Sequence, residues 1–270
     1  MLTEGVAAPQ VHLVVALPGE AEPIIAHYDL VASGGRFPLF VGSDVFLTVS
    51  GVGKVAAAGA TAYLAALKSP GEIWINVGLA GHGSAPFGTA LLAHRVTDGE
   101  TGRNQYPMHT TTPPCQTAHV ITLARPSTQY QEAAFDMEAS AFFETALRFS
   151  TVERIAVLKV ISDNPFESIA EINRARAGAL CESLLPVLDA EIARLRALDS
   201  GPPAPDLDPF LARWHFTVTE QHQLRALLVR HRALAGAPIG CADFQSAKNG
   251  SHLLRQLRER VAALPLLGLD

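Results

Sequence analysis

Two acidic motifs carry the residue types and the placement that catalytic chemistry would need. The first, FDMEA at residues 135–139, opens an apolar helix with the carboxylate of Glu138 in its first turn. The second, VISDN at residues 160–164, ends a hydrophobic strand, and its Asp163 follows Glu138 by 25 positions. Where such a strand ends, the backbone leaves the sheet and side chains face a cleft. Both carboxyl groups are therefore candidates for acid–base or ligand-binding work, although either motif alone is weak evidence.

The elements that must position these motifs alternate between strands and helices. Apolar runs rich in β-branched residues predict strands at residues 11–17, 45–52, 73–79, 90–96, 120–123 and 155–161. Helices are predicted at residues 54–67, 136–149 and 169–198, and Pro18-Gly19 is interpreted as a turn. The apolar runs are too continuous for a sheet with one solvated face. We therefore predict an α/β fold of three layers, with a mostly parallel or mixed central sheet flanked by helices.

The C-terminal part of the chain has a different pattern. A proline-rich stretch indicates a linker at residues 200–208, between a domain at 1–199 and a helical appendage at 209–270. One appendage helix begins near Thr219, and a second carries Leu253, Leu257 and Val261 on one face. We expect the two helices to cover an apolar surface or to form a dimer interface. The alternative is nucleic-acid binding through arginines, here Arg225, Arg230, Arg232, Arg255, Arg258 and Arg260.

Charge and composition exclude several classes of protein. The chain of 270 residues is 48 % apolar with a formal charge of −5, so a sizeable core is expected and nucleic acid is an unlikely main partner. From Pro205 onward, 8 basic residues face 6 acidic ones, which is too small an excess for phosphate binding. The three cysteines form no CxxC pair, and no histidine cluster has metal-ligand spacing. We expect a cytoplasmic protein with reduced thiols, no signal peptide, no membrane span, and no metal or organic cofactor.

Three further motifs precede the two acidic motifs in the sequence. They are ALPGE at residues 16–20, SGVGK at 50–54 and NVGLAG at 76–81. With the two acidic motifs, they resemble the nucleoside phosphorylase/nucleosidase superfamily over residues 11–198. The resemblance is greatest to its hydrolytic branch, which includes the methylthioadenosine/S-adenosylhomocysteine nucleosidases. It implies the phosphorylase-like α/β fold, hydrolysis of a nucleoside, and a homodimer whose partner completes the site near the sugar 5′ position.

The resemblance also assigns roles to the acidic motifs. Cleaving an N-glycosidic bond builds positive charge on the sugar and negative charge on the departing base. A carboxylic acid can protonate that base if burial raises its pKa toward neutrality. Asp163 matches the family position with this role, and Glu138 matches the ribose ligand, with Met137 packed against the sugar. The structural alternatives are a helix N-cap for Asp163 and an ordinary first-turn acid for Glu138. Asp136 is interpreted as a cap.

Two further charged residues match the family's water-activating groups. Glu20 aligns with the general base, and Glu22 is its competitor because a register error of two residues would exchange them. Lys159 stands where the best-known nucleosidases have an arginine beside the water. We expect this lysine to hold Glu20 and Glu138 ionised as a point charge, because a lysine within an apolar strand needs a partner.

The residues that would contact the base are less well defined. Gly78, Leu79 and Ala80 would let backbone approach the ligand, and Ser162 accompanies Asp163. His82 replaces a family glycine and is interpreted as structural or as a contact to substrate. Only 38 residues separate Thr97 from Asp136, where family members fit a strand, a helix and a base-binding loop. Tyr130 and Phe135 are the candidate stacking residues.

The nucleophile is predicted from the absence of a phosphate-binding motif. The Gly-Asp-Pro-x-Arg loop of the superfamily's phosphorylases is missing from this sequence, and so is the arginine near the third strand. A phosphate dianion would lack its cationic cradle, so water is the predicted nucleophile. Two alternatives stay open. One is a phosphorylase with an unusual phosphate site, and the other is a nucleoside-binding or regulatory protein without turnover.

Overall fold

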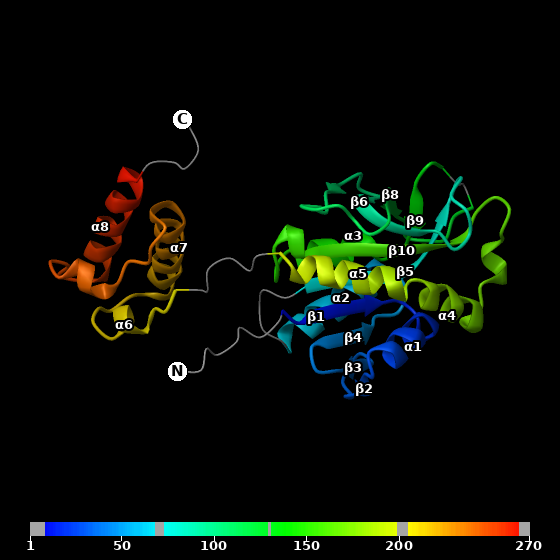
Figure 1. Ribbon diagram of the computed structural model, residues 1–270, viewed down its shortest axis with the longest axis horizontal. Helices are drawn as coiled ribbons and strands as arrows, with labels where there is room; N and C mark the ends of the chain where they lie inside the picture. Colours follow the sequence, from blue (N-terminus) through cyan, green and yellow to red (C-terminus); the bar gives the residue numbers. More distant parts are fainter. Residues whose placement is uncertain (1–8, 68–72, 129–130, 199–204, 265–270) are drawn as a thin grey trace. The chain divides into compact units, whose positions relative to one another are not determined.

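The computed structural model describes residues 9–67, 73–128, 131–198 and 205–264. The chain forms two compact units, Met1–Leu198 and Asp199–Asp270 (Figure 1). The predicted linker lies partly outside the described residues, since 199–204 are not described. Each unit has a core of its own.

In the first unit, ten strands within the described residues form one mixed sheet. They are β1 Val11–Val15, β2 Val31–Ala32, β3 Leu39–Val41, β4 Val45–Val49, β5 Ile73–His82, β6 Ala90–Asp98, β7 Asn104–Gln105, β8 Gln116–Thr122, β9 Ala134–Asp136 and β10 Ile155–Asp163. The central strands are parallel: β1 pairs with β4 and with β5, and β5 pairs with β10.

The long strand β5 closes part of this sheet into a ring. One edge of β5 pairs with β10, and the other pairs first with β1 and then with β9. From β10 the order continues through β6 and β8 to β9, which returns to β5. The ring brings the end of β9, with the first acidic motif, close to the end of β10, with the second.

Helices cover both faces of the sheet (Figure 1). Residues of α1 (Pro18–His27), α4 (Arg174–Ser183) and α5 (Leu185–Arg196) pack on one face. Residues of α2 (Lys54–Ala66) and α3 (Ala139–Ala146) pack on the other. This arrangement confirms the predicted three-layer α/β fold.

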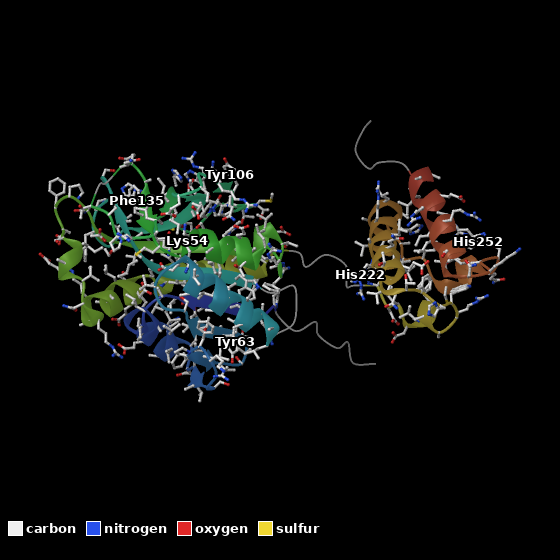
Figure 2. All side chains as sticks on the ribbon, turned by 180° about the vertical axis from the view of Figure 1, so that it is seen from behind. Lys54, Tyr63, Tyr106, Phe135, His222 and His252 are labelled. Carbon is white, nitrogen blue, oxygen red and sulfur yellow. The ribbon has the colours of Figure 1, made fainter. Side chains whose placement is uncertain are left out.

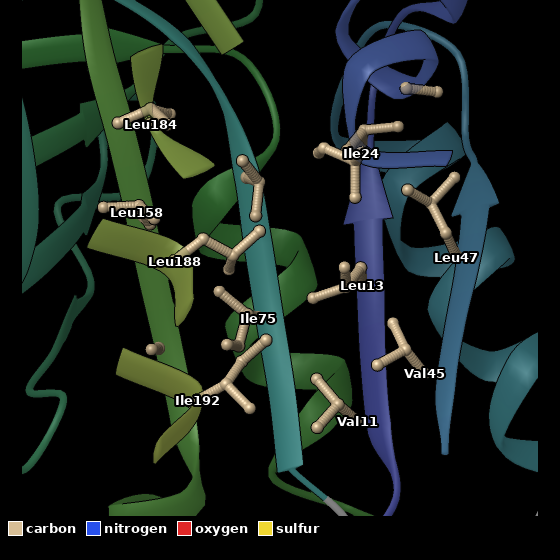
Figure 3. Packing of buried hydrophobic residues seen from close by; sticks show 14 of the residues in the cluster. Val11, Leu13, Ile24, Val45, Leu47, Ile75, Leu158, Leu184, Leu188 and Ile192 are labelled. Carbon is tan, nitrogen blue, oxygen red and sulfur yellow. The ribbon is translucent and has the colours of Figure 1, made fainter. Parts of the chain in front are cut away.

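The packing on the first face follows from the continuous apolar runs in the sequence. Figure 3 shows side chains of neighbouring strands, among them Leu13, Ile75 and Leu158, beside Ile24 of α1 and Leu188 of α5. Because these strands are buried on both faces, apolar residues occupy successive positions rather than alternate ones.

Several predicted boundaries were wrong. The single helix expected at 169–198 is divided into a 3-10 turn, η2 (Ile169–Glu171), followed by α4 and α5. The side chains of Ser168 and Asn173 cap η2 and α4, and Pro186 lies in the first turn of α5, where a missing N–H is tolerated. Pro18-Gly19 opens α1 rather than forming a turn, for the same reason.

Two other corrections affect the site directly. The strand expected at residues 73–79 runs on to His82 as β5, so Ala80 and Gly81 lie within the strand and not after it. The helix expected at 136–149 is shorter: β9 ends at Asp136, a 3-10 turn η1 (Val152–Arg154) precedes β10, and α3 covers only Ala139–Ala146. Glu138 is thus the N-cap residue of α3 and lies between a strand and a helix.

The second unit is helical and has its own apolar core. It contains α6 (Asp208–Leu211), α7 (Val218–Ala235), a 3-10 turn η3 (Cys241–Phe244) and α8 (Gly250–Ala263). A capping box of Thr217 and Glu220 starts α7. His222 of α7 and His252 of α8 are labelled in Figure 2. The core residues are Leu207, Phe210, Trp214, Phe216, Leu224, Leu228, Phe244, Leu253, Leu254, Leu257 and Val261.

Two arginines proposed as alternative phosphate contacts have partners within this unit. Arg258 donates to Gln223 at 2.5 Å. Arg260 donates to the carbonyl of Asp243 at 2.8 Å and lies over the Phe244 ring. In the described part of the chain, no helix has both the length and the apolar character needed to cross a membrane.

Candidate active site

A cavity of about 290 Å³ lies at the carboxyl ends of the parallel strands β1, β4, β5 and β10. This edge is where ligands bind in open α/β sheets, because the loops that leave the strands diverge there. Eight residues predicted for the site line the cavity: Glu20, Leu79, Ala80, Phe135, Met137, Glu138, Ser162 and Asp163. Gly78 and Lys159 are predicted site residues that do not line it.

Glu20 is held rigidly in the first turn of α1. Its Oε2 accepts hydrogen bonds from the backbone N–H groups of Ala16 at 2.9 Å and Leu17 at 2.8 Å, and its Oε1 accepts one from Leu79 at 3.1 Å. The side chain is almost fully buried, and burial raises its pKa above the ordinary value even though these N–H groups and Lys159 lower it. Glu22 instead pairs with Arg174 on the exposed side of α1 and is not part of the cavity lining.

Gly78 serves a different purpose from the one predicted. A Cβ atom at this position would lie 3.1 Å from Glu20 Oε1, so the missing side chain makes room for the carboxylate. Leu79 and Ala80, the next residues of β5, reach the cavity themselves. His82 lies beyond them, and its Nδ1 accepts hydrogen bonds from the N–H groups of Ser84 and Ala85. This histidine is structural, and burial lowers its pKa.

Glu138 is turned away from its own helix. Its Oε1 accepts a hydrogen bond of 2.7 Å from the backbone N–H of Gly53, directly before α2. Burial raises the pKa of Glu138 to about 7, with a further contribution from the negative charge of Asp136. The SGVGK motif therefore contributes through its backbone to holding Glu138, and Glu138 is not an ordinary first-turn acid.

Lys159 has a different partner from those predicted. Its ammonium lies 2.8 Å from Asp136 Oδ2, and both side chains are at most 1 % exposed. Burial alone would lower the pKa of Lys159, but Asp136, Glu138 and Glu20 outweigh it and raise that pKa. The lysine charge lowers the pKa values of Glu20 and Glu138. It does not keep them at ordinary values, because burial has the larger effect.

Asp163 and Ser162 share the end of β10. The strand extends two residues beyond its predicted end, and its register with β5 shifts between Ile161 and Asp163. Consecutive residues of a regular strand face opposite sides, whereas at this irregularity Ser162 and Asp163 both line the cavity. Ser162 Oγ donates a hydrogen bond of 2.6 Å to Asp163 Oδ1. Asp163 does not cap a helix, because Ser168 and Asn173 cap the elements that follow.

Some residues that line the cavity were not predicted from the sequence. Leu123, Arg125, Pro126 and Ser127 line it from the segment after β8. This segment is fixed by hydrogen bonds from Leu123 N–H to the carbonyl of Asp136 and from Ala124 N–H to Glu100. The sequence did contain one signal for this segment, because Arg125-Pro126 follows closely after the strand predicted at residues 120–123. It was not used because none of the motifs that suggested site residues includes these two positions.

The remaining lining residues come from loops and strand ends. Phe135, a candidate stacking residue that is labelled in Figure 2, is one of the residues that line the cavity. Tyr130 lies outside the described residues. Among the described residues, no group of three or more His, Cys, Asp or Glu side chains is placed to hold a metal ion. The rest of the lining is Ala16, Leu17, Val52, Gly81, Asp136, Ile169 and Ile172.

Known proteins match this chain in fold and not in sequence. No model of a protein family matches it, and no curated protein matches it in sequence. The solved structures that match include 5′-methylthioadenosine-type nucleosidases, and this chain shares their fold, which is the fold that the sequence resemblance implied. At identities below a fifth, this likeness establishes the fold alone.

The individual matches are methylthioadenosine-type nucleosidases. The Arabidopsis thaliana 5′-methylthioadenosine nucleosidase has a TM-score of 0.59 at 18 % identity, covering 72 % of this chain and 98 % of that one. The Streptococcus pneumoniae 5′-methylthioadenosine/S-adenosylhomocysteine nucleosidase has 0.55 at 18 %, covering 70 % and 100 %. The Colwellia psychrerythraea enzyme in complex with adenine has 0.55 at 19 %, covering 70 % and 96 %.

Proposed function

We propose that this chain is a nucleoside N-glycosidase that hydrolyses the bond between base and sugar in a purine-type or 5′-modified nucleoside. The observation that carries the proposal is the convergence of Glu20, Glu138 and Asp163 on one cavity. These three acids come from distant segments of the sequence, and each belongs to a different structural element. The shared fold supports the proposal.

Asp163 is the general acid of the proposed reaction. As the C–N bond breaks, its electron pair moves onto the base, and Asp163 supplies the proton that neutralises the departing group. The Ser162 hydroxyl, which donates to Asp163 Oδ1, orients the carboxyl group toward the cavity. No metal or organic cofactor is needed for this step.

Glu138 and Glu20 act on the sugar and on water. Positive charge develops on the sugar as the base departs, and the carboxylate of Glu138 stabilises it while binding the ribose hydroxyls. Water then forms the new C–O bond, and Glu20 takes its proton. The raised pKa of Glu20 makes its carboxylate a stronger base than an exposed glutamate, which suits this role. The products are the free base and the free sugar.

The test is base release from a panel of nucleosides, with and without added phosphate. We expect release that needs no phosphate and that falls about 10²- to 10⁴-fold in Asp163→Asn, the range that a general acid contributes. Glu20→Gln should also lose activity. Glu22→Gln is its matched control, because Glu22 belongs to the same helix but pairs with Arg174 outside the cavity.

Other outcomes would replace the proposal. Release that requires phosphate would indicate a phosphorylase. One observation favours that second candidate: Arg125 is the one cationic side chain among the described lining residues and could contact an anion. Binding of nucleosides without release of base would instead indicate a binding or regulatory protein.

We also propose a homodimer, as the family resemblance implies. Three cavity-lining apolar residues, Leu17, Val52 and Ile169, are 36 %, 51 % and 38 % exposed, which leaves apolar surface at the site for a partner copy to cover. The mass of the native protein in solution tests this part of the proposal.

A further inference from the structure

Asp136 makes more contacts than a helix cap requires. Its Oδ1 accepts a hydrogen bond from the Thr122 hydroxyl of β8 at 2.7 Å. Its Oδ2 accepts from the N–H groups of Ala139 at 2.8 Å and Glu138 at 3.3 Å, and it lies 2.8 Å from the Lys159 ammonium of β10. One fully buried carboxylate thus joins the ends of β8, β9 and α3 to the middle of β10.

These contacts converge on Glu138. The backbone N–H of Glu138 is bound by Asp136, while its side-chain Oε1 is bound by the N–H of Gly53. Lys159, which Asp136 holds, acts electrostatically on both Glu138 and Glu20. Asp136 therefore fixes the position of Glu138 and also the place of the nearest positive charge.

We propose that Asp136 is a positioning residue, which acts through Lys159 and the backbone of residue 138 to hold Glu138 at the cavity and to set the charge it carries. The inference rests on the proposed function, in which Glu138 binds the ribose. It gives the buried ion pair a role in the reaction beyond stabilising the fold. Neither Asp136 nor Lys159 needs to take part in proton transfer for this role.

The groups that face Glu138 from the surrounding elements have opposing effects. Burial raises its pKa most, followed by the charge of Asp136, the preceding strand residue, and Glu20 of α1 adds a smaller increase. Lys159 of β10 and the Gly53 N–H before α2 lower it. The two members of the ion pair therefore act on Glu138 in opposite directions, as neighbouring charges of opposite sign must.

The first experiment titrates Glu138 directly in the full-length protein. Carboxyl ¹³C NMR with labelled glutamate would follow its ionisation, and the resonance is assigned by its loss in Glu138→Gln. Asp136→Asn should move the midpoint below the wild-type value, and Lys159→Met should move it above, each by about one pH unit. Lys159→Arg keeps the charge and should leave the midpoint near the wild-type value.

The outcomes separate this inference from the proposed function. Opposite displacements in Asp136→Asn and Lys159→Met support it, whereas unchanged midpoints or displacements in the same direction overturn it, whether or not nucleosides are cleaved. Absence of base release from the wild-type protein would overturn the proposed function and leave this titration result standing.

A second variant covers the case in which a single substitution prevents folding. The double variant Asp136→Asn/Lys159→Met removes both charges of the ion pair together, so it should fold more readily than either single variant. If Asp136 positions Glu138, KM for the nucleoside stays raised about tenfold or more in the double variant although its melting temperature recovers. Recovery of KM together with stability would overturn the inference.

Discussion

The burial of Glu138 links the proposed chemistry to stability. An ordinary glutamate ionises near pH 4.5, but in the folded protein burial raises the pKa of Glu138 to about 7. Between these two pH values the folded chain keeps a proton that the unfolded chain releases. Stability must therefore fall as pH rises through this window, and above about pH 7 the full cost of the buried charge is present.

Replacing Glu138 with glutamine should therefore stabilise the protein at alkaline pH. Glutamine cannot ionise, yet its side-chain oxygen can still accept the hydrogen bond from Gly53. We expect Glu138→Gln to be more stable than wild type by up to about 3 kcal/mol near pH 8, with the advantage vanishing near pH 4.5. Urea denaturation at the two pH values measures it.

The control for this prediction is Glu144→Gln. Glu144 lies on the exposed side of α3, where it pairs with Arg103 at the surface, and such pairs contribute little. The stability difference between this variant and wild type should be small and similar at both pH values. An equal difference at both pH values for Glu138→Gln as well would contradict the assigned cause.

At the residue scale, the sequence predicted the acids but not their partners. Glu20, Glu138 and Asp163 could be chosen because their motifs match known ones and their residue types suit the chemistry. The pairing of Lys159 with Asp136 and the packing of Gly78 beneath Glu20 depend on how β5, β9 and β10 meet. These strands are far apart in the chain, so no local sequence pattern predicts which of their residues come into contact.

At the element scale, the start of α2 is a positioning element for the site. Gly53 has φ of 102° and ψ of 161°, a backbone conformation that is essentially restricted to glycine. This geometry aims the Gly53 N–H at Glu138 Oε1. A Cβ atom at position 53 would meet nothing within 4 Å, so a side chain there would strain only the backbone.

Gly53→Ala should accordingly damage both stability and substrate binding. We expect a loss of about 1 to 3 kcal/mol in stability from the strained backbone, and a raised KM because Glu138 loses its anchor. Gly34→Ala is the matched control: Gly34 also has positive φ, at 68°, and open space around it, but it lies in the loop between β2 and β3. Both variants should melt earlier than wild type, and an unchanged KM in Gly53→Ala would refute the anchoring role.

The elements themselves were predicted with uneven success. Strands β1, β4, β5 and β10 were found because they are continuous apolar runs buried on both faces. Helix α1 was missed because Pro18-Gly19 reads as a turn, although proline is also favoured in the first turn of a helix. The division of residues 169–198 depends on the cap at Asn173, which starts α4, and on Pro186 in the first turn of α5, although the helical pattern of the sequence continues through both positions.

At the scale of the whole molecule, all the described residues that line the proposed site lie in the first unit. Its described lining residues extend from Ala16 to Ile172. The second unit buries its apolar residues in a separate core, where Leu224 of α7 meets Leu253 and Leu257 of α8. The sequence anticipated these amphipathic helices but not that they would pack on each other with Trp214 and Phe244.

This division predicts that the two units fold and melt separately. A chain of residues 1–204 should fold and retain base release, because it contains both large core clusters and every lining residue of the cavity. A chain of residues 205–270 should also fold, but with only about 3 to 5 kcal/mol of stability, since so small a core buries little apolar surface.

Thermal melts followed by circular dichroism would compare both fragments with the full chain. The full-length melt should equal the sum of the two fragment melts. Aggregation or loss of base release in the 1–204 fragment would mean that the second unit contributes to the fold or to the site, and the proposed function would then have to be reconsidered for the whole chain.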